Sequence, residues 1–152
     1  MTKPKYQAIE NKDMRRFLLN DGKSYIEIIA GTYNGIKGPA STFSPINRYN
    51  AKLKKGASAD FSFKKSFNTG ILVIEGEVKI NNLKTVSTDH FAYFGHDSED
   101  IVIEAIDDCI VLILSGEPIN EPIASYGPSV MNTESEIKQA YDDFYNGKFG
   151  HL

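Results

Sequence analysis

The stretch Ile71–Ile80, with the sequence ILVIEGEVKI, decides the fold class. Four consecutive apolar residues, three of them β-branched, run into Glu75–Gly76, a pair that can form a tight turn into a second apolar segment, Val78–Ile80. Asn81–Asn82 is the next reversal signal. Apolar runs this short, closed by turn residues, are typical of β-strands rather than of helices.

The same arrangement recurs on both sides of this stretch. Tyr25–Ala30 (YIEIIA) follows the turn sequence Asn20–Gly22, and Ile101–Ile106 (IVIEAI) is separated from Ile110–Leu114 (IVLIL) by the hairpin signal Asp107–Asp108. We therefore predict a meander of short strands in an all-β domain. Because several runs are continuously apolar and do not alternate, we expect them to be buried between two layers, as in a jelly-roll β-barrel.

Near its C-terminal end the chain changes to a helical period. Thr133 to Glu136 form a capping box, in which each of the two side chains can bond the other residue's amide. An apolar stripe follows at helical spacing, and Gly147 stands where a left-handed C-terminal residue is favoured. We predict a helix over residues 133–146. Its apolar side chains either pack on the chain's own barrel or dock on another molecule; the candidate docking residues are Ile137, Tyr141, Phe144 and Phe149.

Between the last apolar run and this helix, the prolines at 118, 122 and 128 bar a helix or a central strand. We interpret residues 115–128 as an extended connector. With no flexible linker and no repeat elsewhere, residues 1–152 are predicted to form a single domain that begins with an N-terminal connector arm over residues 1–23.

Composition narrows the class of function. The chain has 152 residues, 41% of them hydrophobic, with 17 basic and 20 acidic residues and a net charge of −3, so no global positive field attracts nucleic acid. A single cysteine, Cys109, fits a reducing compartment, and no apolar run approaches the roughly 20 residues that span a bilayer. We expect a cytoplasmic protein that binds neither membrane nor, directly, nucleic acid.

Several residues with reactive or charged side chains have both an ordinary and a functional interpretation. His90 and His96 are either solvated loop residues or one half of a His–carboxylate proton shuttle, and His151 lies next to the C-terminus. Cys109 follows two aspartates, which oppose a reactive thiolate. Five lysines flank Phe61 and Phe63 and form either a solvated sheet edge or an anion-binding patch: Lys52, Lys54, Lys55, Lys64 and Lys65.

Residues Leu114–Gly150 (LSGEPINEPIASYGPSVMNTESEIKQAYDDFYNGKFG) resemble the C-terminal signature of the pirin family, which has a G-x-P-x-x-E-P stretch, then G-P-F-V-M-N-T and an acidic helix ending in G-x-F-G. Ile28–Ile46 is similar to the entry into the family's second cupin, and Lys3–Gln7 to the segment that joins the two cupins. One departure is Ser129, where the family usually has Phe. The resemblance implies a cupin (RmlC-like) jelly-roll β-barrel with one C-terminal helix, corresponding to the second half of a pirin.

Pirins are bicupins, and the resemblance places their iron-type site in the first cupin, on a His-x-His pair, a further His and a Glu. Members are associated with quercetin-type dioxygenation or with binding to transcription factors. When Gly56 and Gly76 are aligned with the glycines of the general cupin motif, the ligand positions fall on residues that make no convincing metal site: Ser62, Lys64, Thr69 and, less closely aligned, Tyr93. We therefore expect neither a metal nor another cofactor in this barrel.

These observations favour a non-catalytic cupin domain that completes a bicupin assembly, either as a homodimer or with a separately encoded first cupin. The alternatives are a small-molecule dioxygenase or other cupin enzyme acting at the barrel mouth, and a fragment of a longer pirin gene.

Overall fold

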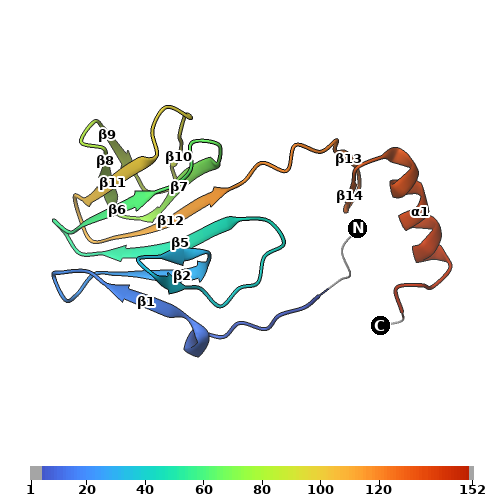
Figure 1. Ribbon diagram of the computed structural model, residues 1–152, viewed down its shortest axis with the longest axis horizontal. Coiled ribbons are helices and arrows are strands. Elements are labelled where there is room, and N and C mark those ends of the chain that lie inside the picture. Colours follow the sequence, from blue (N-terminus) through green and yellow to red (C-terminus); the bar gives the residue numbers. More distant parts are fainter. Residues whose placement is uncertain (1–4, 151–152) are drawn as a thin grey trace. The chain divides into compact units, whose positions relative to one another are not determined.

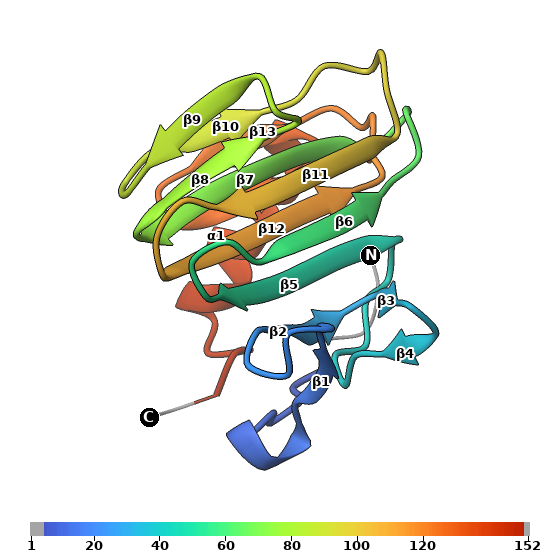
Figure 2. The ribbon, with the colours of Figure 1, turned by 90° about the vertical axis from the view of Figure 1, so that its left-hand side faces the viewer.

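The structure is a computed structural model that describes residues 5–150, and it is built mainly from two β-sheets that face each other (Figures 1 and 2). The six-stranded sheet has the order β1 (Arg15–Leu18), β2 (Tyr25–Ala30), β5 (Ile46–Leu53), β12 (Cys109–Gly116), β7 (Asn68–Glu75), β10 (Phe91–Tyr93). The four-stranded sheet has the order β6 (Ser58–Ser62), β11 (Asp100–Ala105), β8 (Glu77–Ile80), β9 (Lys84–Ser87). A short hairpin of β3 (Thr32–Tyr33) and β4 (Ile36–Lys37) and a 3-10 turn (Asn11–Asp13) complete this part. The all-β jelly roll is confirmed.

The core lies between the two sheets because alternate side chains of every long strand point inward. In the six-stranded sheet, the register aligns Ile28, Tyr49, Ile113 and Ile71 across four strands, and all four are buried. In the four-stranded sheet, Ile103 stands opposite Ile80 and is fully buried.

The predicted turns are present, but the predicted meander is wrong at two of them. Asn81 and Asn82 have positive φ of 48° and 56° and connect the paired strands β8 and β9, as expected. By contrast, β7 and β8 lie in different sheets, and so do β11 and β12. The turns at Glu75–Gly76 and Asp107–Asp108 therefore carry the chain from one sheet to the other and do not close hairpins.

The N-terminal arm predicted over residues 1–23 contains a sheet strand. Arg15–Leu18 pair with β2 as β1, and Asp21 shapes the hairpin turn by accepting hydrogen bonds from the amides of Lys23 and Ser24 at 3.0 and 2.8 Å. These bonds, together with one from the Ser24 hydroxyl, lower the pKa of Asp21. Gln7 is held by two hydrogen bonds to the backbone of Pro39 and Ser41, whereas Lys3 and Pro4 lie outside the described residues.

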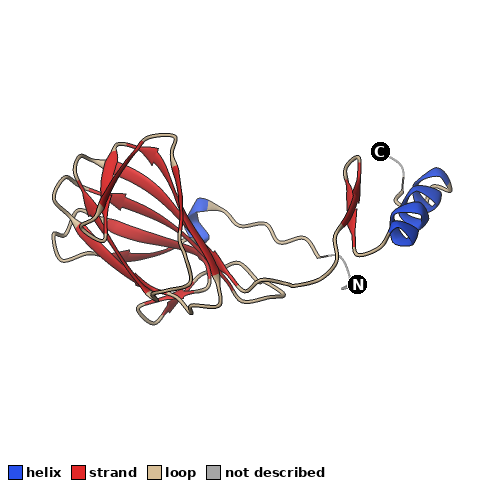
Figure 3. Cartoon of the chain, turned by 90° about the horizontal axis from the view of Figure 1, so that it is seen from above, coloured by secondary structure: helices blue, strands red, loops and turns tan. Residues whose placement is uncertain are grey.

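The chain divides into two compact units, Met1–Pro118 and Ile119–Leu152. The second unit is a hairpin of β13 (Ala124–Tyr126) and β14 (Ser129–Met131) followed by α1 (Glu134–Tyr145) (Figures 1 and 3). The expected connector 115–128 therefore gives its first two residues to β12 and its last part to this hairpin, which turns at Gly127–Pro128.

The helix begins as predicted. The Thr133 hydroxyl accepts from the Glu136 amide at 3.3 Å, and the Glu136 carboxylate accepts from the Thr133 amide at 3.0 Å. Among the described residues, no helix is long and apolar enough to cross a membrane.

Candidate functional site

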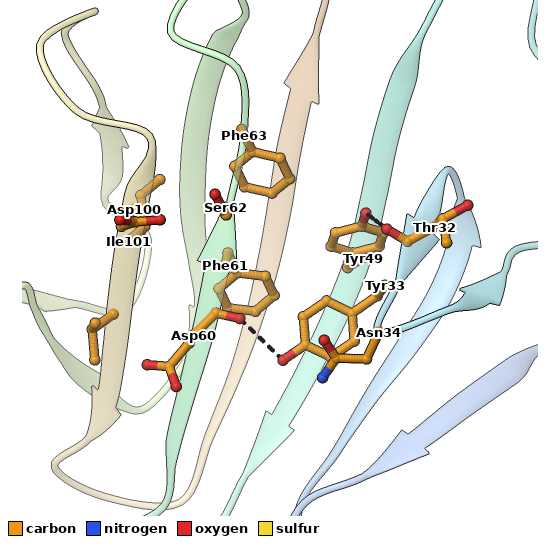
Figure 4. Close-up of a pocket in the computed structure, with 11 residues that line it drawn as sticks. Thr32, Tyr33, Asn34, Tyr49, Asp60, Phe61, Ser62, Phe63, Asp100 and Ile101 are labelled. Atoms are coloured by element: carbon orange, nitrogen blue, oxygen red, sulfur yellow. Dashed lines mark hydrogen bonds between the residues drawn. The ribbon is translucent and has the colours of Figure 1, made fainter.

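The inside of the barrel is filled by aromatic side chains at the end where the two sheets separate. Tyr33 of β3, Tyr49 of β5, Phe61 of β6 and Phe63 just after β6 face one another, with ring centroids 5.3 to 6.3 Å apart (Figure 4). All four are at least 92% buried. A barrel packed in this way has a core where a ligand-binding barrel would have an open interior.

Backbone acceptors satisfy the two phenols of this cluster. The Tyr33 hydroxyl donates to the carbonyl of Asp60 at 3.1 Å, and the Tyr49 hydroxyl lies 2.7 Å from the carbonyl of Thr32 (Figure 4). Burial raises the pKa of Tyr49 to about 12, so this phenol stays protonated at neutral pH. Throughout residues 5–150, every buried polar side-chain atom has a hydrogen-bond partner, so none is left free toward a missing ligand.

A cavity of about 480 Å³ lies at the outer margin of the aromatic cluster. Its polar lining includes Asp60, Ser62 and Asp100, which are exposed residues of β6 and β11. Ser62 stands directly opposite Asp100 in the strand register. These three polar residues therefore line the cavity from the outer surface of the four-stranded sheet, and Thr32 and Asn34 line it from the β3–β4 hairpin.

The residues aligned with the general cupin ligands do not come together. Ser62 and Lys64 are exposed, whereas Phe61 and Phe63 next to them point inward. Thr69 is buried and shares a 2.8 Å hydrogen bond with Ser115. Tyr93 is 63% exposed and donates to the side-chain oxygen of Asn68.

The donor set therefore does not fit a transition metal. Phe61 on β6 and Phe63 just after this strand turn phenyl rings inward, and the one predicted position that is buried, Thr69, already has its partner. Within the described part of the chain, no group of three or more His, Cys, Asp or Glu residues has the arrangement of a metal site.

The histidines and the cysteine show ordinary environments. His90 Nδ1 lies 2.9 Å from the Thr88 carbonyl and 3.4 Å from the Ser87 hydroxyl, and His96 Nδ1 bonds the Lys65 carbonyl, so none of the bonds found for these rings is to a carboxylate. Cys109 is buried, and burial raises the pKa of its thiol to about 11, which opposes a reactive thiolate. His151 lies outside the described residues.

The five lysines do not form one free basic patch. Lys54 pairs with Asp108 at 2.6 Å and Lys55 with Asp107 at 3.0 Å, and the bond between Lys54 and Asp108 raises the pKa of the lysine and lowers that of the aspartate. Lys52 lies over the ring of Tyr25, with its ammonium 5.8 Å from the ring centre. The two aspartates of the predicted hairpin turn thus neutralise part of the predicted patch.

The predicted docking residues divide into two groups. Ile137 is buried, and Tyr141 packs edge-on against Tyr126 with ring centroids 5.5 Å apart, so these two hold α1 to its own hairpin. Phe144 and Phe149 are 61% and 68% exposed. Only the second group is free to bind another surface.

The two sheets differ sharply on their outer faces. On the four-stranded sheet, the outward residues of β6 and β11 are polar except for Val102. On the six-stranded sheet, the register gathers large apolar side chains on the outer face of β7, β10 and β12, and we call them the apolar face: Leu72, Ile74, Phe91, Tyr93, Ile110, Leu112 and Leu114. Phe91 lies over Gly70, where an added Cβ would come within 2.2 Å of the ring.

This apolar face was not predicted as a candidate site, although its signal is present in the sequence. The continuous runs ILVI and IVLIL predicted strands buried on both sides, and the structure buries one side. Ile74 and Leu114 remain 45% and 36% exposed on the other side. A solvated sheet face normally carries polar residues, so these positions are candidates for a contact with another molecule.

Comparison with known proteins agrees with the architecture. The chain is 41% identical to a structure of quercetin 2,3-dioxygenase from Acinetobacter baumannii, with a TM-score of 0.91 over 99% of this chain and 52% of that one. It is 36% identical to a provisionally named quercetin 2,3-dioxygenase of Pseudomonas aeruginosa and 31% identical to human pirin, covering 98–99% of this chain and 52% of each relative. The chain therefore spans about half the length of these relatives.

Residues 48–150 match the Pirin C-terminal cupin domain. This range of the chain includes the barrel core, the connector and the hairpin–helix unit. The match covers more than half of the chain, and the chain belongs to the pirin family.

Proposed function

We propose that this chain is a metal-free, non-catalytic cupin domain whose role is to complete a two-cupin assembly. Its partner is a second copy of itself or a separately encoded first cupin. Its single cysteine, buried and without a disulfide, suits a cytoplasmic setting.

The observation that carries the proposal is the apolar face of the six-stranded sheet. Leu112, Leu72 and Phe91 follow one another across the adjacent strands β12, β7 and β10, whereas the outward residues of β6 and β11 on the other sheet are polar except for Val102. Exposed apolar patches of this kind are rare on monomers and mark contacts with other proteins.

The barrel interior supports a role without chemistry. A cupin enzyme holds its reacting groups inside the barrel, where this chain places Tyr33, Tyr49, Phe61 and Phe63 in mutual contact. The cavity at their margin presents carboxylates that lie on the outer sheet surface. Neither surface offers the convergent acid, base or metal ligands that catalysis requires.

The names of the relatives favour a second candidate function, that of a quercetin-type dioxygenase. Because this chain spans half of those relatives, any such activity belongs to an assembly that also supplies the counterpart of the other half. In that case the role of this barrel is to hold its partner, and chemistry by this chain alone is not expected.

Metal analysis separates the two candidates. The purified chain, expressed in medium supplemented with iron or with copper, is expected to carry no stoichiometric metal and to leave quercetin unchanged. A stoichiometric metal together with quercetin consumption by the chain alone would overturn the non-catalytic proposal. A monodisperse monomer at micromolar concentration would contradict its homodimer version and leave a separate first cupin as the partner.

A further inference from the structure

We propose, resting on the function proposed above, that the apolar face is covered by the hairpin–helix unit of a second copy of this chain. The contact is reciprocal: each copy places its residues 119–150 on the six-stranded sheet of the other. The apolar tip of the unit, Phe144 and Phe149, meets the apolar face defined above.

The hairpin–helix unit needs a partner surface on energetic grounds. Its only buried apolar side chain among the described residues is Ile137, whereas the large apolar side chains that it exposes are Ile119, Ile123, Tyr126, Val130, Phe144, Tyr145 and Phe149. Units below about 40 residues rarely hold a fold without disulfides, metals or association. The one cysteine of the chain lies in the barrel, so no disulfide can form within the hairpin–helix unit. Association with another surface is the means of stabilisation that we propose for it.

The charges of the two surfaces are complementary. Residues 134–148 contain four carboxylates and two lysines, and Lys148 is already paired with Asp143 at 2.7 Å. Beside the apolar face, β5 presents Arg48 and Lys52 outward, opposite Leu114 and Ile110, and neither cation forms an ion pair within the described residues. The acidic helix can therefore lie along this cationic margin.

A second copy of the chain supplies one hairpin–helix unit for the apolar face of the first copy and one apolar face for its hairpin–helix unit. A two-fold pair forms the same tail-to-sheet contact twice, which doubles the buried area for one association event.

Two substitutions in separate chains test the reciprocal contact. Leu114→Glu alters the sheet and leaves the tail intact, and Phe144→Glu alters the tail and leaves the sheet intact. Each variant alone has two altered contacts per dimer, so its dissociation constant is expected to rise about 30-fold or more. An equimolar mixture restores one unaltered contact, and a mixed dimer is expected at concentrations where each variant alone is monomeric.

Leu83→Glu is the matched control, because Leu83 is 87% exposed at the β8–β9 turn and lies outside both surfaces. It is expected to dimerise like the unaltered chain, and circular dichroism checks that all variants fold. Dimers that persist in either variant, or a mixture of two monomeric variants that stays monomeric, would overturn the inference. Those outcomes would not contradict the proposed function. The proposed function itself would be contradicted by a chain that binds a stoichiometric metal and consumes quercetin.

Discussion

Gly76 lies where the chain crosses from one sheet to the other, and the neighbouring atoms leave no room there for a Cβ atom. Its φ is +80°, and a Cβ there would lie 2.3 Å from the carbonyl oxygen of Asp108 and 2.8 Å from the Cβ of Cys109. Gly76→Ala is expected to lower the free energy of unfolding by about 3 kcal/mol, because left-handed strain adds to an overlap with backbone. Urea denaturation measures the change.

Gly56→Ala provides the control for this prediction. Gly56 has the same φ of +80°, and no atom lies within 4 Å of the position that a Cβ would occupy, so only the backbone strain of about 1 kcal/mol is expected. Equal losses at the two positions would show that the close approach at Gly76 costs nothing.

The buried phenol of Tyr49 makes the stability of the barrel fall as the pH rises through the alkaline range. Burial raises the pKa of its phenol from 10.0 to about 12, so the unfolded chain releases this proton at lower pH than the folded chain does. The contribution of Tyr49 to stability is therefore complete below about pH 10 and falls as the pH rises toward 12. Cys109, with its pKa raised from 9.0 to about 11, adds to the same decline from pH 9 upward.

Tyr49→Phe is expected to cost about 1 kcal/mol at pH 8, since it removes the bond to the Thr32 carbonyl, and to flatten the decline of stability between pH 10 and 12. Urea midpoints at several pH values measure both effects. Tyr6→Phe, at a position that is 90% exposed and lies outside both proposed surfaces, is expected to leave the profile unchanged. An identical alkaline profile in Tyr49→Phe and the unaltered chain would contradict the assignment.

At the residue scale, strand alternation limits what a motif alignment can predict. Aligning the cupin motif by its glycines placed ligand positions on Ser62 and Lys64, whereas the inward side chains are Phe61 and Phe63. A shift of one residue moves a strand's side chains to the opposite face. A motif alignment therefore does not specify which side chains fill the barrel interior.

Among the elements, α1 is the one whose start the sequence predicts in full. Thr133→Ala removes the acceptor for the Glu136 amide and is expected to destabilise the helix by about 1 kcal/mol. Faster hydrogen exchange at the first amides of α1 and a weaker helical circular dichroism signal measure the loss. Lys138→Ala, at an exposed position inside the helix, is the control, and unchanged exchange in Thr133→Ala would argue against the cap.

Truncation before Thr133 tests whether α1 serves docking or the core. Because Phe144 and Phe149 are exposed, the shortened chain is expected to keep its β-sheet spectrum and to lose the dimer. Sedimentation and circular dichroism on the same sample measure the two properties. Global unfolding would show instead that Ile137, Tyr141 and Phe144 belong to the barrel core.

The elements were easier to predict than their pairing. Local turn chemistry located the reversals at Gly76, Asn81–Asn82 and Asp107–Asp108, because each depends on neighbours along the chain. Whether a reversal closes a hairpin or changes sheets depends on distant strands, such as β12 pairing with β5 and β7. Residues 124–131 were missed as a hairpin because prolines lie before and within the segment and the strands are only three residues long.

For the whole molecule, the central feature is the difference between the two outer faces. The outer face of the four-stranded sheet is polar, whereas Phe91, Leu112 and Leu114 lie on the outer face of the six-stranded sheet that we propose to be covered by a partner. The apolar runs that predict a two-layer core also supply the outward apolar side chains of this face. Which molecule covers the face depends on a second surface, and sequence periodicity within one strand does not specify it.

The most direct test of an associating, non-catalytic domain is the mass and the metal content of one sample. Sedimentation equilibrium of the purified full chain at about 1 to 100 μM, followed by elemental analysis, is expected to give twice the 16.9 kDa of one chain with no stoichiometric metal. A species of one chain mass that carries one metal ion per chain would contradict the account.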